Sequence, residues 1–187
     1  MEDSEILQKF LQPETRNVAF NQLIRKYQQR VYWHIRKMVI DHDDADDLTQ
    51  EVFIKVWNKL ADFRQDAQLY TWLYRIATNE CLNFLKSKKR KFFLPLHDLT
   101  EELSQKIDEN AGPNGDEIQL NLQKALLRLP DKQRLVFNMR YYDELKYEEI
   151  SEILGTSVGA LKASYHMAVK KLKIFLKPLK PFCLDPI

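Results

Sequence analysis

Residues 146–173 read KYEEISEILGTSVGALKASYHMAVKKLK, and this stretch decides the fold of the second half of the chain. Apolar residues recur every three or four positions on both sides of Gly155, which predicts two helices. Glycine tolerates the positive φ at which a chain leaves a helix, and Ser157 is suited to cap the next helix. The stretch therefore predicts a helix-turn-helix, whose second helix enters the DNA major groove.

The second of these helices has an apolar face and an opposite face rich in bases. Apolar side chains suited to the core lie at Leu161, Tyr165, Ala168 and Leu172. The cationic face holds Lys162, His166, Lys170 and Lys173. Small or apolar side chains near the leading end suit contacts with thymine methyl groups: Ala160, Ala163, Ser164 and Met167. Phosphate contacts would then supply most of the affinity. An ordinary helical hairpin with a solvated lysine face is the alternative.

Charge is unevenly distributed along the 187 residues, although the formal net charge is only +2. No Asp or Glu occurs between Cys81 and His97 or between Ile153 and Leu184, and lysines gather in both stretches. Between them, residues 92–118 hold seven acidic residues and one base. Two basic blocks joined by an acidic segment indicate two contacts with a polyanion. Two solvated helix faces would give the same pattern.

Helical periodicity also fills the first half, where no glycine precedes position 112. It predicts a helix that ends near Asp41, a second one from the acidic cluster 43–47 to about Leu60, and a third from about Tyr70 to Lys89. Their expected inward residues include Ala45, Leu48, Val52 and Val56, then Leu73, Ile76, Ala77 and Phe84.

Residues 92–118 lose the periodicity and contain the breaker AGPNG, which predicts a mobile linker. The helical pattern resumes at Leu120, and Leu135, Val136 and Met139 are expected to face inward. The predicted fold class is all-α: two small helical bundles joined by a flexible acidic linker, the C-terminal one containing the helix-turn-helix.

Two surfaces of the first bundle are candidates for binding. Between Phe63 and Lys91, aromatic side chains alternate with bases and amides, as in proteins that stack unpaired bases. Packing of these aromatics inside the bundle is the alternative. The second helix carries a polar stripe that suits docking on a basic partner: Asp47, Gln50, Glu51, Ile54 and Asn58.

Catalytic and metal sites are not expected. The acidic cluster 43–47 is explained by helix-start stabilisation better than by magnesium binding, because no phosphate-binding loop accompanies it. The two cysteines and four histidines lack metal-ligand spacing. The chain carries no catalytic signature, signal peptide or apolar run of about 20 residues. We therefore expect a cytoplasmic protein that is not an enzyme, has no cofactor and does not insert into membranes.

Four motifs resemble sigma-70-type factors, in the same order along residues 16–176. Residues 46–57, DDLTQEVFIKVW, resemble the helix that binds core polymerase, and Phe63-Arg64 followed by residues 70–77, YTWLYRIA, resembles the segment that melts the −10 promoter element. Residues 129–141 and 147–159 resemble the domain that binds the −35 element. In lacking further domains, the chain resembles the extracytoplasmic-function subfamily. Many members carry arginines where this chain has Ser164, Met167 and Val169, so the resemblance does not define the −35 sequence preference.

The resemblance implies a division of the chain. Residues 1–91 would form sigma region 2, 92–118 a linker, 119–177 sigma region 4 and 178–187 a tail. The partners would be core RNA polymerase, through its β′ clamp helices and β flap, promoter DNA and, as a further candidate, an anti-sigma factor. Core polymerase would contact Asp47, Leu48, Gln50, Glu51, Ile54, Lys55 and Asn58. The −10 DNA would contact Phe63, Arg64, Tyr70, Trp72, Tyr74, Arg75, Asn79, Asn83 and Lys86. The −35 DNA would contact Ser157, Gly159, Ala160, Lys162, Ala163, Ser164, His166, Met167 and Lys170.

Three other functions compete with this one. A regulator that binds operators without polymerase would share the helix-turn-helix but would give the first bundle no role. A recombinase-like enzyme would cleave DNA strands by itself, and a structural adaptor would show no salt-dependent affinity for DNA.

Overall fold

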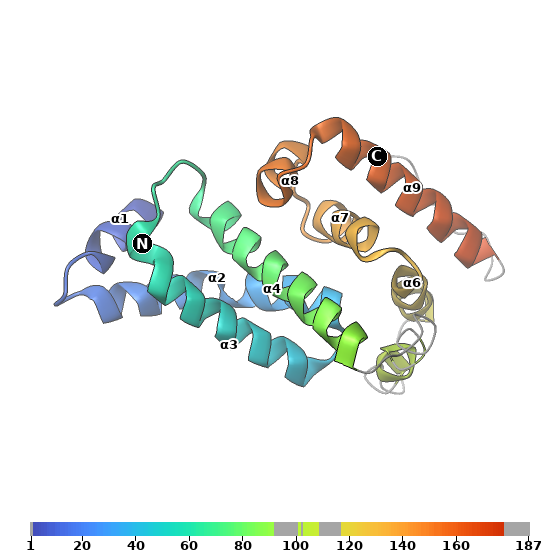
Figure 1. Cartoon of the computed structure of the whole chain (residues 1–187), viewed down its shortest axis with the longest axis horizontal. Coiled ribbons are helices and arrows are strands. Elements are labelled where there is room, and N and C mark those ends of the chain that lie inside the picture. The colour runs from blue at the N-terminus through green and yellow to red at the C-terminus, as the bar shows by residue number, and fades with distance from the viewer. Residues whose placement is uncertain (1, 92–100, 102, 109–116, 178–187) are drawn as a thin grey trace. The chain divides into compact units, whose positions relative to one another are not determined.

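The computed structural model describes residues 2–91, 101, 103–108 and 117–177, and side chains up to Lys88 in the first of these ranges. The chain forms two compact units: the first holds the residues up to Leu85 together with Glu152–Leu154, and the second holds the other residues after Leu85. Figure 1 colours these helices in chain order. All regular structure within the described residues is helical, which confirms the predicted fold class.

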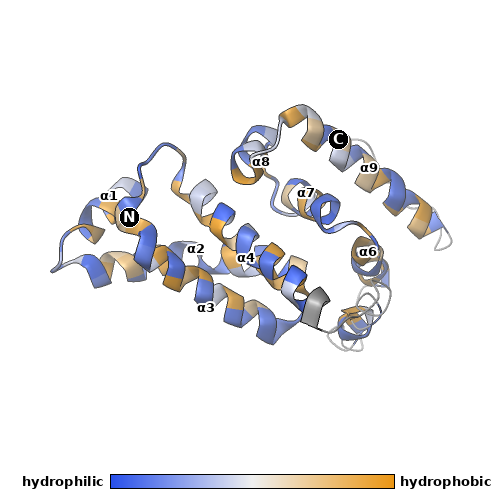
Figure 2. Cartoon of the chain, in the orientation of Figure 1, coloured by the Kyte–Doolittle hydropathy of each residue, from blue (hydrophilic) through white to orange (hydrophobic). Residues whose placement is uncertain are grey.

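The first unit is a bundle whose core lies between three long helices. Its elements are α1 (Asp3–Phe10), α2 (Arg16–Val39), α3 (His42–Lys59), the short 3-10 helix η1 (Leu60–Asp62) and α4 (Leu69–Lys91). The fully buried side chains include Leu23, Val31, Ile35, Val52, Val56, Leu73 and Ala77. They recur at helical spacing because each helix turns one apolar stripe towards the core. Figure 2 shows hydrophobic and hydrophilic residues alternating along these helices.

Helix α3 begins where the acidic cluster predicted it. The Asp41 carboxylate accepts a hydrogen bond from the Asp44 backbone N–H at 2.9 Å, which caps the helix. Helix α2 ends just before this cap at Ile40, whose φ is 69° although it is not glycine. Because Ile40 is buried, its apolar contacts offset the strain of the left-handed backbone.

Helix α1 was not predicted from the sequence. It is short, and its apolar side chains Ile6, Leu7 and Phe10 are buried against the rest of the unit. The Asp3 carboxylate accepts hydrogen bonds from the Tyr27 hydroxyl at 2.7 Å and from Lys26 Nζ at 2.7 Å. Tertiary contacts with α2 therefore stabilise a helix that would be marginal in isolation.

The second unit packs its last helix against two earlier ones. Its elements are α6 (Glu117–Leu127), α7 (Asp131–Tyr141), α8 (Tyr147–Leu154) and α9 (Val158–Leu176). A buried cluster joins α6, α7 and α9: Leu122, Ala125, Leu126, Leu129, Phe137, Ala168, Leu172 and Leu176. Leu135, Val136 and Met139 are buried as expected. Lys171 Nζ donates to Gln133 Oε1 at 3.0 Å and so connects α9 to α7.

Part of the expected linker is structured. Residues 103–108 are helical, and Leu103 and Ile107 are buried. Lys124 Nζ lies 2.6 Å from a carboxylate oxygen of Asp108, and α6 begins at Glu117 rather than at Leu120. The expectation of a mobile linker over 92–118 therefore does not fit residues 103–108, which form a helix with two buried apolar side chains four positions apart. The rest of that segment and the 178–187 tail lie outside the described residues.

Candidate DNA and polymerase interfaces

The corner between α8 and α9 has the geometry that the sequence predicted. Gly155 has a φ of 61°, and its N–H donates to the Ser151 carbonyl at 2.9 Å. The Ser157 side chain caps α9 by accepting from the Ala160 N–H at 3.3 Å. Ile150 and Leu161 are buried in the angle between the helices. Left-handed glycine and the serine cap thus fix a tight helix-turn-helix.

The exposed face of α9 contains the candidate −35 residues. Ser164 is half-buried, and the other eight are exposed: Ser157, Gly159, Ala160, Lys162, Ala163, His166, Met167 and Lys170. Lys162 Nζ lies 5.8 Å from the centre of the Tyr147 ring, and the Arg140 guanidinium lies 5.4 Å from the same ring. Burial raises the pKa of Tyr165, whose ring stacks on Phe137 at 5.6 Å, so Tyr165 is partly buried and packs against the core.

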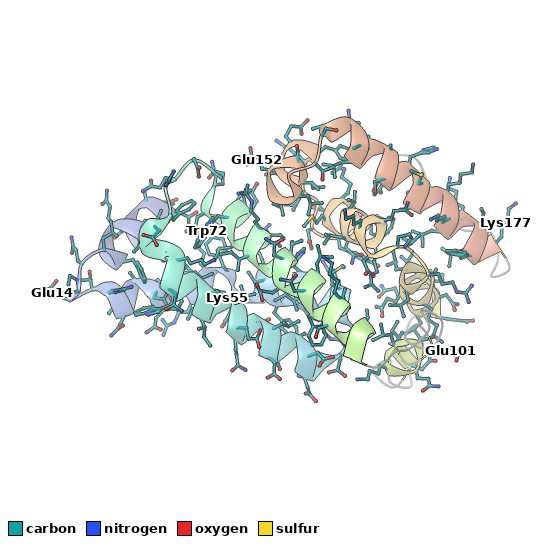
Figure 3. All side chains as sticks on the ribbon, in the orientation of Figure 1. Glu14, Lys55, Trp72, Glu101, Glu152 and Lys177 are labelled. Atoms are coloured by element: carbon teal, nitrogen blue, oxygen red, sulfur yellow. The ribbon has the colours of Figure 1, made fainter. Side chains whose placement is uncertain are left out.

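The exposed face of α4 brings together four of the candidate −10 residues. Arg75, Asn79, Asn83 and Lys86 are exposed and lie three or four positions apart, so they line one side of the helix. Arg64 in the preceding loop is also exposed. Trp72, labelled on α4 in Figure 3, packs its ring 5.1 Å from that of Phe63, and both are partly exposed. The aromatic pair therefore lies at the N-terminal end of α4 and its preceding loop, and the stripe continues from Arg75 towards the C-terminal end of the helix.

Tyr74 does not belong to this face. Its side chain is only 2% exposed, and its ring lies 4.7 Å from that of buried His34 on α2. The prediction that Tyr74 contacts −10 DNA is therefore wrong, because its ring fills the core between α2 and α4. Tyr70 is partly buried, with its ring 6.4 Å from that of Tyr74.

Helix α3 exposes the polar stripe that the sequence assigned to polymerase. Its exposed members are Asp47, Gln50, Glu51, Ile54 and Asn58. Ile54 is 62% exposed, whereas isoleucine side chains are most often buried. Leu48 is only 5% exposed, so the prediction that it contacts polymerase is wrong. Its position on the inward side of the helix gives it a core role instead.

Lys55 is partly exposed, and its ammonium forms an ion pair with Glu80 of α4. Figure 3 labels Lys55 on α3. Sequence reasoning missed Glu80 because the pair is 25 residues apart and no local pattern connects the two positions. The two helices that carry the candidate polymerase and −10 surfaces are thus connected through Lys55.

The described residues contain no group of three or more His, Cys, Asp or Glu side chains placed to hold a metal ion. Within the same residues, no helix is both long and apolar enough to cross a membrane.

Comparisons with known proteins agree with this geometry. The sequence profile of sigma-70 region 2 matches residues 23–91, and that of sigma-70 region 4 matches residues 119–172. The RNA polymerase sigma-H factor of Pseudomonas aeruginosa is 30% identical over 95% of either chain. The chain belongs to the sigma-70 family.

Further relatives place this sigma factor in the extracytoplasmic-function subfamily. The ECF RNA polymerase sigma factor SigW of Bacillus subtilis is 33% identical, and the match covers 86% of this chain and 90% of SigW. Two solved structures share the fold at 23% identity. The sigma factor RpoE from Bartonella quintana, in complex with the anti-sigma factor NepR, has a TM-score of 0.66 and a match covering 84% of this chain and 96% of RpoE. CnrH, in complex with the cytosolic domain of CnrY, has a TM-score of 0.68 and a match covering 94% and 96%.

The family defines the activity. This sigma factor is a transcription initiation factor that binds core RNA polymerase in the cell interior and directs it to promoters.

Proposed function

We propose that this sigma factor divides promoter recognition among three helix faces: α9 binds the −35 element, α4 captures the melted −10 element and α3 docks on core polymerase. Sigma region 2 would occupy residues 1–91, region 4 residues 119–177, and the segment between them would be the connecting linker. The observation that carries the proposal is the exposure of three separate faces with different chemistry on one short chain.

The α9 face supports duplex binding. Its exposed bases Lys162 and Lys170 suit phosphates, and its small leading residues allow the helix to approach base edges closely. Apolar Ala163 and Met167 favour thymine methyl groups over the bidentate hydrogen bonds that arginine makes to guanine.

The α4 face supports capture of an unpaired strand. Trp72 and Phe63 offer ring surfaces to bases, and Arg75, Asn79, Asn83 and Lys86 offer donors to phosphates and base edges. Pulling a base from the duplex costs a few kcal/mol, which stacking at about 1–3 kcal/mol per base can offset. The β′ clamp helices would hold this surface in place by binding the polar stripe of α3.

Partners and location follow from the same assignment. The protein would act by binding and not by catalysis, in the cytoplasm where RNA polymerase works. Because the structural relative RpoE is bound by an anti-sigma factor, we include such a factor among the partners of this chain. It would compete for faces that polymerase and DNA need.

A reconstituted holoenzyme tests the proposal. The full chain and core polymerase should transcribe from selected genomic promoters, and permanganate should modify unpaired thymines in their −10 elements. Arg75→Ala combined with Asn79→Ala should reduce this opening and leave core binding unchanged. Asn17→Ala, an exposed amide near the start of α2 and outside the α4 face, is the matched control. Unchanged opening with the double variant would refute the role of the α4 face.

A further inference from the structure

Helix α2 carries charge of one sign only. Its 24 residues include no Asp or Glu and six bases: Arg16, Arg25, Lys26, Arg30, Arg36 and Lys37. The neighbouring α3 exposes acidic residues instead, so the two helices give the first unit surfaces of opposite charge. A helix with several positive charges and no acid attracts polyanions.

Only some of these bases are occupied within the unit. Lys26 Nζ lies 2.7 Å from Asp3, and the Arg16 guanidinium lies 4.6 Å from the Phe10 ring centre. Arg25 is exposed and Arg36 is half-buried. Among the residues that the structure describes, neither of these two arginines takes part in an ion pair. Their guanidinium groups are therefore available to an external anion.

An exposed tryptophan lies between these arginines. Trp33 is 51% exposed, and its ring packs edge-on at 5.3 Å against Tyr32. The Tyr32 hydroxyl in turn lies 2.7 Å from His42 Nδ1 at the start of α3. This contact holds the Tyr32 ring, against which the indole packs. Residues spaced three or four apart share one side of a helix. The side that contains Trp33, called the α2 face from here on, comprises Gln22, Arg25, Gln29, Trp33 and Arg36.

The packing contacts of α2 with α4 come from Arg30 and His34, which are not members of the α2 face. The Arg30 guanidinium lies 6.0 Å from the centres of both the Tyr70 and Tyr74 rings at the start of α4. His34 Nε2 lies 2.9 Å from Thr78 Oγ1 one turn further along both helices. None of the five residues of the α2 face takes part in these contacts, so this face is a surface separate from the α4 face.

We propose that the α2 face is a second binding surface for single-stranded DNA, separate from the α4 face that captures the −10 strand. Arg25 and Arg36 would bind phosphates, Gln22 and Gln29 would donate hydrogen bonds, and the Trp33 ring would stack on a base. An acidic protein surface would also match the charge of the arginines. It would not explain the exposed indole between bases and amides, which suits stacking on a nucleic-acid base. The inference rests on the proposed −10 role of α4.

Site-specific crosslinking in the holoenzyme tests the contact directly. A photoreactive p-benzoylphenylalanine replaces Trp33 in one full-length variant and Asn79 of α4 in another, on a promoter with an unpaired −10 segment. Both probes should crosslink to the DNA strand. A probe at 33 that crosslinks to a polymerase subunit, or to nothing, while the probe at 79 crosslinks to DNA, overturns the α2 proposal alone. Failure of both probes to reach DNA overturns the α4 assignment as well.

Salt dependence gives an independent measurement. Arg25→Ala with Arg36→Ala should lower the slope of log affinity against log salt by about 1.4, which is two single-strand phosphate contacts of about 0.7 each. Trp33→Ala should weaken binding roughly tenfold without a change in slope, since stacking does not release counterions. Lys132→Ala, an exposed base on α7 outside the three proposed faces, is the matched control. A slope equal to that of this control would overturn the proposal.

Discussion

Replacement of Lys162 and Lys170 by alanine should weaken −35 binding in a way that salt concentration reveals. Both lysines are exposed on α9, and they lie eight residues apart. Eight residues span about 12 Å along a helix axis, so the two ammonium groups reach different phosphates. The double variant therefore removes two independent contacts.

The size of the effect follows from counterion release. Each phosphate contact on duplex DNA contributes about 0.9 to the salt slope, so the slope should fall by about 1.8. If only this electrostatic contribution changes, affinity falls about 30-fold at 0.15 M salt and about 200-fold at 0.05 M. The loss should be nearly the same for every −35 sequence, because phosphates carry no base identity.

Fluorescence anisotropy of holoenzyme on a labelled promoter, measured over a range of salt concentrations, gives the slope. Lys171→Ala is the matched control, because the Lys171 ammonium is already held by Gln133 on the side of α9 that faces α7. The control should keep the parental slope. A double variant with unchanged slope and affinity would show that α9 does not present this face to DNA.

Three further predictions concern the first unit and the turn before α8. Asp47→Lys should weaken core polymerase binding in a titration while the melting temperature stays near the parental value, because the side chain is exposed; parental affinity would refute the α3 docking face. Leu48→Ala should show the opposite pattern, with the free energy of unfolding lower by about 2–5 kcal/mol, since that side chain is buried. Glu144 is exposed and has a φ of 55°, so Glu144→Gly should stabilise the chain by roughly 0.5–1 kcal/mol in denaturant unfolding. A less stable variant would mean that the left-handed backbone carries no strain there.

Local patterns were enough to predict the helix-turn-helix and most of the helices. Gly155, Ser157 and the apolar spacing act within a few residues of one another, so the corner follows from the sequence alone. The same is true of the polar stripe on α3, whose five members all face solvent. Leu48 was assigned both to the core and to the polymerase surface, and its helical position favours the core.

Long-range contacts explain what the sequence did not predict. Tyr74 is buried because His34, forty residues earlier on another helix, packs against its ring. Helix α1 and residues 103–108 are too short for a clear period, and each has buried apolar side chains that a local pattern does not reveal. The sequence shows that α2 contains no Asp or Glu. Whether this produces a basic surface depends on which of its Arg and Lys side chains the fold leaves exposed.

The ion pair between Lys55 and Glu80 has a consequence for genetics. A screen for mutants that fail to assemble with polymerase would be expected to recover substitutions at Glu80, on a helix assigned to DNA. Loss of that carboxylate frees the Lys55 ammonium, which then adds an unbalanced positive charge beside the polar stripe of α3. The assembly defect would thus map to α4, although the proposed contact with polymerase is on α3. A second substitution at Lys55 that restores assembly would reveal that the ion pair connects the two.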